Sequence, residues 1–392
     1  MSPKERFLTA MRNDVPDRVP VAPDTSNYIP CKRTGLPYWD VYFFDAVPLW
    51  RAYLDVVDHF GFDAWIASCT SAPLRHDASP VASDSKIVYD KQRDAMIRRT
   101  THRTPDGELD TEDVCYRHDP PTPTVKPIKD LRADFEKFKW LRQPPTGIDT
   151  EAVARIRTEC EKRDQAFGLC IGYPGFQAWM GAVQGGVEPL CYAHADTPEI
   201  LDEWFEIDMA IGTAAMKWIL SVEPDYVLLG GSGTITLASP DLAMKYAVPA
   251  IKRWTGMAKE AGVPTMLHSC GRQRALVDLL VEHTDTDCVN PLEIPPMGDV
   301  DLAELKRARG GRIALMGNLH TTDVMLRGSP EQVRAASIEA MRVAGEGGGF
   351  ILSTGDQCPR DTPDENLFAM VTAATELGVY DRQTGRLPTL QS

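Results

Sequence analysis

The chain has 392 residues, of which 43% are hydrophobic and 25% are charged, and its formal net charge is −14. This acidic balance argues against binding to nucleic acid or to an anionic membrane surface, both of which require clustered Lys and Arg. The sequence contains no recognisable secretory leader and no run of about 18 apolar residues, so we expect a cytoplasmic protein that acts on small molecules or on another protein.

Short apolar segments alternate with amphipathic segments along most of the chain, which is typical of a parallel α/β sheet. Seven segments are predicted strands: 64–68, 167–172, 226–231, 264–270, 288–292, 313–317 and 350–354. Four segments have the period and length of crossover helices: 197–220, 240–261, 275–284 and 330–346. Seven strands, with an eighth easily missed, predict a (β/α)8 TIM barrel that forms one domain over 1–392, and an open doubly wound sheet is the alternative.

Residues 86–129 interrupt this alternation. They contain short alternating segments, a turn signal at 105–107 and a proline-rich end at 119–123. We therefore predict an antiparallel β insertion in the N-terminal third of the chain, packed beside the mouth of the barrel.

Three potential metal ligands follow predicted strands. His268 and Cys270 end the apolar run that begins at residue 263, and Cys358 follows the run 350–356. Side chains at i and i+2 of a strand point to the same face. If both runs are parallel strands of one barrel, the three side chains meet at its C-terminal mouth and offer zinc one imidazole and two thiolates, with a fourth position open. Gly271 permits a tight turn directly after Cys270.

The competing interpretation is ordinary packing, because a lone His or Cys in a strand is more often a core residue. The residues alone leave both interpretations open. The nine cysteines lack framework spacing, which indicates a reducing compartment rather than a disulfide scaffold. Cys69 also follows a strand and is left open, and the remaining cysteines are assigned to packing: Cys31, Cys115, Cys160, Cys170, Cys191 and Cys288.

Several segments together resemble the uroporphyrinogen decarboxylase superfamily, and within it the corrinoid:thiol (coenzyme M type) methyltransferase branch. The matching segments are 4–7, 16–21, 267–271, 298–302, 314–318, 348–352 and 362–367. The resemblance implies a (β/α)8 barrel with zinc held by His268, Cys270 and Cys358. Decarboxylases of this superfamily resemble one another through an Arg-Gln-Ala-Gly-Arg segment, whereas this chain reads Pro-Asp-Thr-Ser-Asn-Tyr at 23–28. This departure disfavours porphyrinogen decarboxylation.

The resemblance implies a zinc-dependent methyltransferase. Zinc converts a thiol into a thiolate, which would attack the methyl group of a corrinoid, methylcobalamin. No Asp-x-His-x-x-Gly segment of the cobalamin-binding type is present, so we expect the corrinoid on a separate carrier protein. The other expected partner is a small thiol or methylated substrate, and homodimer formation is left open.

Five further residues are candidates for the site. Glu293 is predicted to bond to His268 or to act as a fourth ligand, and Asp356 to orient a ligand, although a solvated carboxylate and a turn cap are the respective alternatives. Asn318 at another strand end, Tyr28 in the segment 27–42 and Tyr173 are candidate substrate-binding residues. Tyr173, with Phe176 and Trp179, suits a pocket wall for a flat corrinoid, and the alternative is packing.

Two other functions remain open. A corrinoid-dependent demethylase of a methyl ether, amine or thioether, or a methylcobalamin:tetrahydrofolate methyltransferase, could use the same zinc. A decarboxylase-like barrel without metal chemistry would retain His268 and Cys270 only as remnants.

Overall fold

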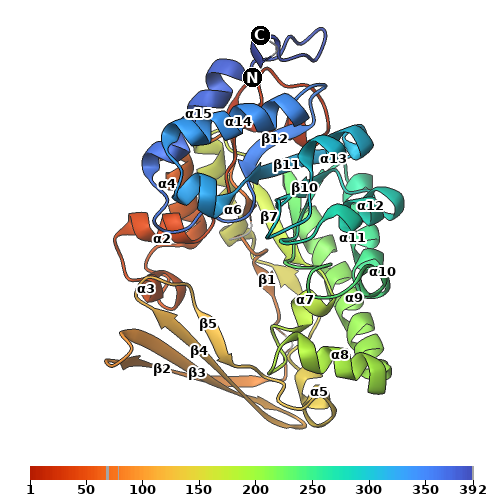
Figure 1. The fold of residues 1–392 in the computed structure, drawn as a ribbon. Helices are drawn as coiled ribbons and strands as arrows, with labels where there is room; N and C mark the ends of the chain where they lie inside the picture. Colours follow the sequence, from red (N-terminus) through yellow and green to blue (C-terminus); the bar gives the residue numbers. More distant parts are fainter. Residues whose placement is uncertain (68–69, 78, 391–392) are drawn as a thin grey trace.

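The computed structural model describes residues 1–67, 70–77 and 79–390 (Figure 1). Its centre is a parallel sheet of six strands in the order β7-β8-β9-β10-β11-β12. Their bounds are β7 (Gly168–Gly172), β8 (Tyr226–Gly230), β9 (Thr265–His268), β10 (Cys288–Asn290), β11 (Ala314–Leu319) and β12 (Phe350–Thr354). Each strand overlaps one predicted from the sequence, and helices connect them as the crossovers of a parallel sheet require.

Two N-terminal segments close this sheet into a barrel. Val21 pairs in parallel with Leu352 of β12, and Ser71 pairs in parallel with Cys170 of β7. Between the two segments, the Asp63 N–H donates to the Val21 carbonyl at 2.8 Å. The chain therefore folds as the predicted (β/α)8 barrel and not as the open sheet.

The second barrel position differs from the prediction. Residues 64–67 are buried but form no regular strand, and Ser68 lies outside the described residues, as does Cys69. The Tyr226 hydroxyl donates to the Trp65 carbonyl at 2.9 Å and accepts the Ala67 N–H at 3.1 Å. Because a side chain satisfies these backbone groups, they do not form the ladder of hydrogen bonds that defines a strand.

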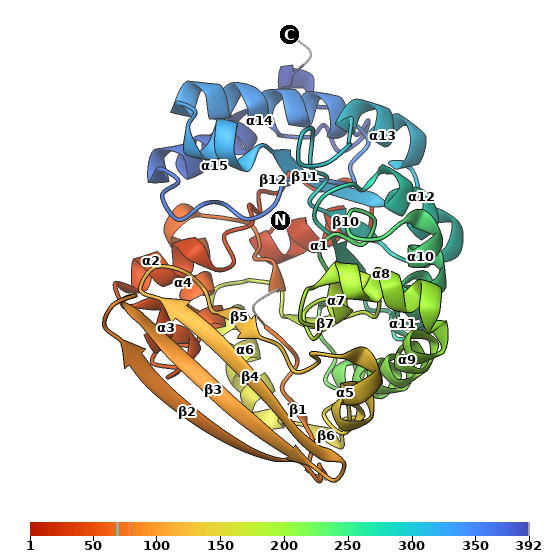
Figure 2. The same ribbon diagram turned by 60° about the horizontal axis from the view of Figure 1, so that its bottom comes forward.

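Helix α1 (Pro3–Met11) covers the N-terminal end of the barrel. In Figure 2 the N-terminus lies behind the centre of the ring of strands. Its Phe7 packs edge-on against Tyr226, with ring centroids 5.5 Å apart. The predicted helix 240–261 is divided in two, because Pro249 begins a new helix at its first turn.

The other helices surround the barrel. They are α2 (Tyr28–Thr34), α3 (Tyr38–Tyr42), α4 (Leu49–Phe60), α5 (Leu131–Lys139), α6 (Thr150–Lys162), α7 (Phe176–Trp179), α8 (Val187–Asp196), α9 (Pro198–Ser221), α10 (Pro240–Tyr246), α11 (Val248–Glu260), α12 (Arg274–His283), α13 (Leu302–Arg309), α14 (Pro330–Ala344) and α15 (Asp364–Leu377). A π-helix, Thr321–Leu326, and a 3-10 helix, Pro388–Leu390, complete the set. None of the helices in the described part of the chain has both the length and the apolar character that a membrane span requires.

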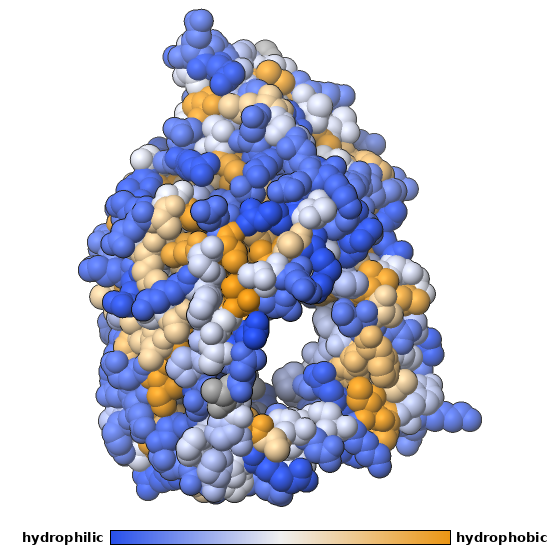
Figure 3. All heavy atoms as spheres, turned by 180° about the vertical axis from the view of Figure 1, so that it is seen from behind, coloured by the Kyte–Doolittle hydropathy of each residue, from blue (hydrophilic) through white to orange (hydrophobic). Residues whose placement is uncertain are grey.

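The antiparallel insertion is confirmed as a four-stranded sheet. It consists of β2 (Ala82–Asp90), β3 (Ala95–Thr104), β4 (Gly107–Tyr116) and β5 (Thr122–Val125), in that order, and a separate two-stranded pair joins β1 (Leu74–Arg75) to β6 (Gly147–Ile148). Figures 1 and 2 place the four-stranded sheet at the mouth of the barrel, away from both termini. Figure 3 shows an opening in the surface on this part of the molecule. The assignment of 1–392 to a single domain stays a prediction.

A buried ion-pair cluster holds the first two barrel segments together. The Asp63 side chain, which is 1% exposed, accepts the Val21 N–H at 2.8 Å. The backbone N–H of Asp63 donates to the Val21 carbonyl, so two hydrogen bonds join these residues. Arg6 of α1 donates to Asp63 at 2.6 Å, and Arg18 donates to both of its carboxylate oxygens at 2.8 and 2.9 Å. The carboxylate thus links α1 to both closing segments.

We expect Asp63→Ala to lower the free energy of unfolding by about 3 to 5 kcal/mol, because it removes the carboxylate that pairs with the largely buried Arg18 and one of the two carboxylates that pair with Arg6. Asp58→Ala is the control, since Asp58 pairs with Arg163 at the surface and is expected to cost less than about 1 kcal/mol. Urea denaturation of both variants measures the difference. Equal and small losses in the two variants would show that Asp63 does not hold the barrel closed.

Candidate metal centre

The strand register places four residues in one row at the C-terminal ends of β7 to β10. Gly172 pairs with Gly230, Gly230 with His268, and His268 with Asn290. Residues two positions earlier in these strands pack inside the barrel, so the row also faces its interior. A Cβ on Gly172 would meet nothing closer than 3.7 Å, whereas a Cβ on Gly230 would lie 2.9 Å from Sγ of Cys170.

Asn290 orients the His268 imidazole. Its side-chain oxygen lies 2.5 Å from Nδ1 of His268, and its amide nitrogen donates to the Met316 carbonyl at 3.5 Å. With this amide orientation Nδ1 carries the proton, because the Asn290 oxygen can only accept. The other ring nitrogen, Nε2, is then left with a lone pair that points towards the mouth of the barrel.

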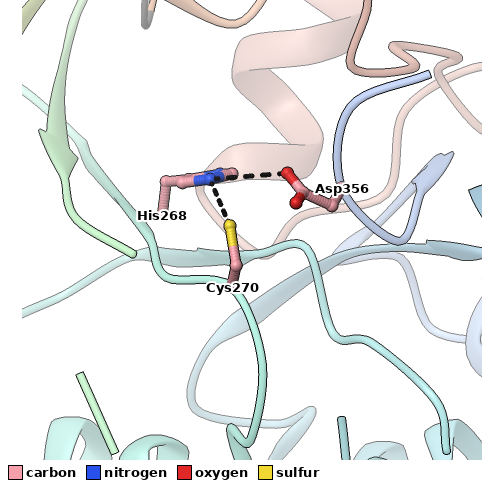
Figure 4. A group of neighbouring side chains, drawn as sticks. All are labelled: His268, Cys270 and Asp356. Carbon is pink, nitrogen blue, oxygen red and sulfur yellow. Dashed lines mark hydrogen bonds and ion pairs between the residues drawn. The ribbon is translucent and has the colours of Figure 1, made fainter. Parts of the chain in front are cut away.

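Two more donor atoms face Nε2 (Figure 4). The Cys270 thiol lies 3.2 Å from it and the Asp356 carboxylate 3.9 Å. One ligand atom from each of these three half-buried residues lies within 4.8 Å of the others, and no other such group of His, Cys, Asp and Glu is found among the described residues. These separations are close to the roughly 3.3 to 3.8 Å between ligands of one tetrahedral zinc ion. The sequence prediction that His268 and Cys270 come together at the mouth is consistent with this geometry.

Gly271 is required directly after Cys270. Its φ angle of +85° lies in the left-handed region, and a Cβ at this position would lie 2.2 Å from the Thr236 hydroxyl. The Gly271 N–H donates to the buried Glu293 carboxylate. The expected tight turn is present, and it presents the Cys270 thiol to the imidazole.

Burial governs the titration of the groups around this site. It raises the pKa of the Cys270 thiol, and the charges of Asp356 and Glu293 raise it further. Burial also raises the pKa of Glu293 and of Asp24, although His268 opposes the rise in both. The protein alone therefore favours a protonated thiol at neutral pH, and a cation would be needed to convert it into a thiolate.

Cys358 lies outside the group of three donors. Its side chain is fully buried, and its backbone N–H donates to the Asp24 carbonyl at 2.7 Å. Asp356, two residues earlier, has a φ angle of +95°, a conformation that non-glycine residues rarely adopt. The Thr354 hydroxyl donates to the Asp356 carbonyl at 2.7 Å and accepts the Asp24 N–H at 3.0 Å. The loop is thus held so that the Asp356 carboxylate lies 3.9 Å from Nε2 of His268. The role of Cys358 as a ligand stays a prediction.

The expected bond from Glu293 to His268 is not present. The Glu293 carboxylate accepts the Gly271 N–H, and the imidazole bonds to Asn290 instead. The sequence analysis did not single out Asn290 or Asp24. Asn290 lies within the predicted strand 288–292, and Asp24 follows the apolar residues 19–23, so the position of each at or after an apolar segment was the available signal.

Asn318 and Tyr173 lie near this site, each held by specific bonds. The Asn318 amide donates to the Leu292 carbonyl at 2.9 Å. The Tyr173 hydroxyl lies 2.7 Å from the Thr234 hydroxyl and donates to the His268 carbonyl at 3.4 Å. Tyr173 therefore supports the end of β9 through its hydroxyl group, and binding of substrate by either residue stays a prediction.

The remaining aromatic candidates belong to helices α2 and α7. Tyr28 is half-buried on α2, where its carbonyl accepts the Tyr38 hydroxyl at 2.7 Å. Phe176 and Trp179 are buried in a helical cluster, in which Trp179 stacks on Trp204 with ring centroids 5.1 Å apart. Packing is thus the structural role of these two residues.

Known proteins resemble this chain over nearly its whole length. A methylcobamide:CoM methyltransferase of Methanosarcina mazei is 28% identical, covering 95% of this chain and 97% of the relative. A uroporphyrinogen decarboxylase of Anaeromyxobacter dehalogenans is 26% identical, covering 95% and 99%. A solved methyltransferase from Methanosarcina mazei has the same fold, with a TM-score of 0.66, 18% identity and coverage of 96% and 99%.

These relatives include a methyltransferase and a uroporphyrinogen decarboxylase, the two kinds of protein in the superfamily that the sequence resembles. The match of residues 116–377 to the uroporphyrinogen decarboxylase (URO-D) description extends over more than half of the chain. It includes β7 to β12 and therefore both His268 and Cys270. The chain belongs to the uroporphyrinogen decarboxylase (URO-D) family.

Proposed function

We propose that this protein is a zinc-dependent methyltransferase that moves a methyl group between a corrinoid and a thiol. The observation that carries the proposal is the meeting of His268 Nε2 and Cys270 Sγ, 3.2 Å apart, beside Asp356 at the mouth of the barrel. The mouth is where barrel enzymes bind their substrates. The names of the methyltransferase relatives support the same chemistry.

The donor set fits zinc. A neutral imidazole nitrogen and a thiolate are typical zinc ligands, and two cysteinates with one histidine leave a position open for a substrate thiol. His268 and Cys270 would hold the ion, with Cys358 as the third ligand and Asp356 as the group that orients or replaces it. Bound zinc supplies one chemical function, since it converts the substrate thiol into a nucleophilic thiolate at neutral pH.

The protein's own groups prepare the site in three ways. Asn290 keeps the proton of His268 on Nδ1, so that Nε2 is available for coordination. Gly271, with a φ angle of +85°, allows the tight turn directly after Cys270. Glu293 fixes the turn that presents Cys270 through the Gly271 N–H.

The charges near the site disfavour porphyrinogen decarboxylation, the activity named for other relatives. A porphyrinogen carries several carboxylates that need cationic partners. Among the described residues, the strongest charges acting on Glu293, Asp24 and Cys270 are those of other acidic groups and of His268. Acidic surroundings of this kind would repel the carboxylates of a porphyrinogen.

The corrinoid would be delivered by a carrier protein. The opening visible in Figure 3, at the mouth end of the barrel, is consistent with access for a large partner. Demethylation of a methyl ether, amine or thioether onto the corrinoid, or transfer of the methyl group to tetrahydrofolate, would use the same zinc ligands with a different methyl donor or acceptor. Methyl-donor screening distinguishes these reactions.

The zinc site predicts metal content. We expect about one zinc per chain in anaerobically purified protein and a loss of the metal in Cys270→Ser, because a serine hydroxyl is a far weaker zinc ligand. Cys191→Ser is the matched control, since Cys191 is exposed and outside the site. Elemental analysis of Cys358→Ser and Asp356→Asn decides which residue is the third ligand. A wild-type protein without zinc, or zinc unaffected by Cys270→Ser, would refute the site.

The hydrogen bond from His268 to Asn290 predicts that substitutions of Asn290 change the affinity for zinc. Asn290→Leu removes the acceptor of the Nδ1 proton and is expected to weaken zinc binding by about 10- to 100-fold, as outer-shell substitutions do. Asn290→Asp keeps an acceptor at the same place and is expected to retain zinc. Competition with a chromophoric chelator measures both affinities. If Asn290→Leu bound zinc as tightly as the wild type, Asn290 would have no orienting role.

The acidic residues around the site predict that the enzyme prefers a thiol substrate without a negatively charged group. With methylcobalamin as donor, we expect 2-mercaptoethanol to be methylated about 10-fold faster than 2-mercaptoethanesulfonate at low salt, because the sulfonate is repelled by nearby carboxylates. The two thiols differ mainly in this group, and cobalamin absorbance follows each reaction. A faster reaction of the sulfonate, the thiol named for the relatives, would contradict this preference while supporting the methyltransferase proposal.

A further inference from the structure

A buried amide, the side chain of Gln273, links the two loops that carry the candidate metal centre. Gln273 lies directly before α12, at the end of the turn that follows Cys270, and it is fully buried. Its nitrogen donates to the Ser269 carbonyl, and to the Asn290 carbonyl at 2.9 Å. Its oxygen accepts the Leu292 N–H at 2.6 Å. Both N–H donors and the oxygen of the amide are therefore used to join the chain after β9 to the end of β10.

Two of these three bonds act next to the donor atoms of the site. The Ser269 carbonyl belongs to the peptide bond before Cys270, so its bond to Gln273 fixes the plane from which the thiol side chain projects. Asn290 bonds to Nδ1 of His268 through its side chain, while its backbone carbonyl accepts from Gln273. One amide group thus constrains the position of the thiol relative to the imidazole.

The third bond holds a residue in a rare conformation. Leu292 has a φ angle of +64°, in the left-handed region that non-glycine residues seldom adopt. Such a residue keeps this conformation only where its surroundings compensate the cost. The Gln273 oxygen accepts the Leu292 N–H, and the next residue, Glu293, accepts the Gly271 N–H. The two loops are therefore joined by a side chain from each of them.

We propose that Gln273 is a positioning residue of the zinc site, which sets the separation between the Cys270 thiol and Nε2 of His268. The inference rests on the proposed function, because it takes these two atoms as zinc ligands. Gln273 would act through the backbone of the ligands and their neighbours, without touching the ion. The Ser269 N–H would still donate to the Asn290 carbonyl at 3.0 Å in its absence, so we expect a displaced ligand and not an unfolded barrel.

The test compares Gln273→Met with Gln165→Met. The first substitution keeps the length of the side chain and removes all three hydrogen bonds, and we expect it to weaken zinc binding about 10-fold, as outer-shell substitutions do. Gln165 is 3% exposed and precedes β7, at the opposite end of the barrel, so its substitution controls for the loss of a buried amide. Competition with a chromophoric chelator measures the affinity of the full-length proteins, and thermal unfolding without metal measures their stability.

Cobalt(II) supplies a readout that a general loss of stability would not change. Its visible absorption depends on the geometry of its ligands, and it binds to the same kinds of donor as zinc. We expect Gln273→Met to alter the cobalt spectrum of the wild type. Gln165→Met is expected to leave the spectrum unchanged, even where it lowers the unfolding temperature.

Asp299→Ala keeps the test decisive if Gln273→Met does not fold. The exposed Asp299 carboxylate accepts the Gln273 N–H at 2.8 Å and the Arg274 N–H at 3.1 Å. Its removal loosens the backbone of Gln273 without leaving a buried cavity. We expect zinc affinity to fall about 3-fold, the effect of losing exposed hydrogen bonds.

The outcomes separate this inference from the proposed function. Zinc affinity and a cobalt spectrum equal to those of the wild type, in whichever of Gln273→Met and Asp299→Ala fold, would overturn the role of Gln273 alone. Equal losses of affinity in Gln273→Met and Gln165→Met would also overturn it, since the cause would then be reduced stability. A wild-type protein that binds neither zinc nor cobalt would refute the proposed function and this role together.

Discussion

A single buried carboxylate, Asp63, holds the segments on which barrel closure depends. The six regular strands form a continuous parallel sheet, but an open sheet would leave the edges of β7 and β12 unpaired. The two segments that cover these edges are too short and irregular to form ladders of their own. Asp63 joins Val21, Arg6 and Arg18 at one point, so the N-terminal residues remain in register with β12.

The candidate metal centre depends on this closure. His268 and Asn290 come from neighbouring strands, whereas Asp24 reaches the site from the first closing segment and bonds to the loop after β12. The alternation of side chains along each strand determines which of these residues face inwards. A shift of one residue in the register would point His268 away from the barrel interior, and closure prevents such a shift.

The sequence predicted the parts of the structure that have a local signature. Apolar strands revealed β7 to β12, and the spacing of His268 and Cys270 placed both on one face. The partner of the imidazole had no local signature, because Asn290 is adjacent to His268 only through strand pairing. The segment 64–67 was predicted as a strand from its composition, but the Tyr226 hydroxyl satisfies its backbone groups instead. Contacts between distant residues account for both differences.

Charge balance offers an independent argument for a cation at this site. Asp24 and Glu293 are 2% and 5% exposed, and Asp356 lies close enough to raise the pKa of both. Burying carboxylates near one another is unfavourable unless protons or a cation compensate their charge. Nδ1 of His268 is bonded to Asn290, and Nε2 faces the Cys270 thiol and the Asp356 carboxylate, where the proposed ion would bind. A divalent ion at Nε2 would balance the carboxylates and at the same time stabilise the Cys270 thiolate, so the zinc proposed from the soft ligands would also compensate the acidic residues.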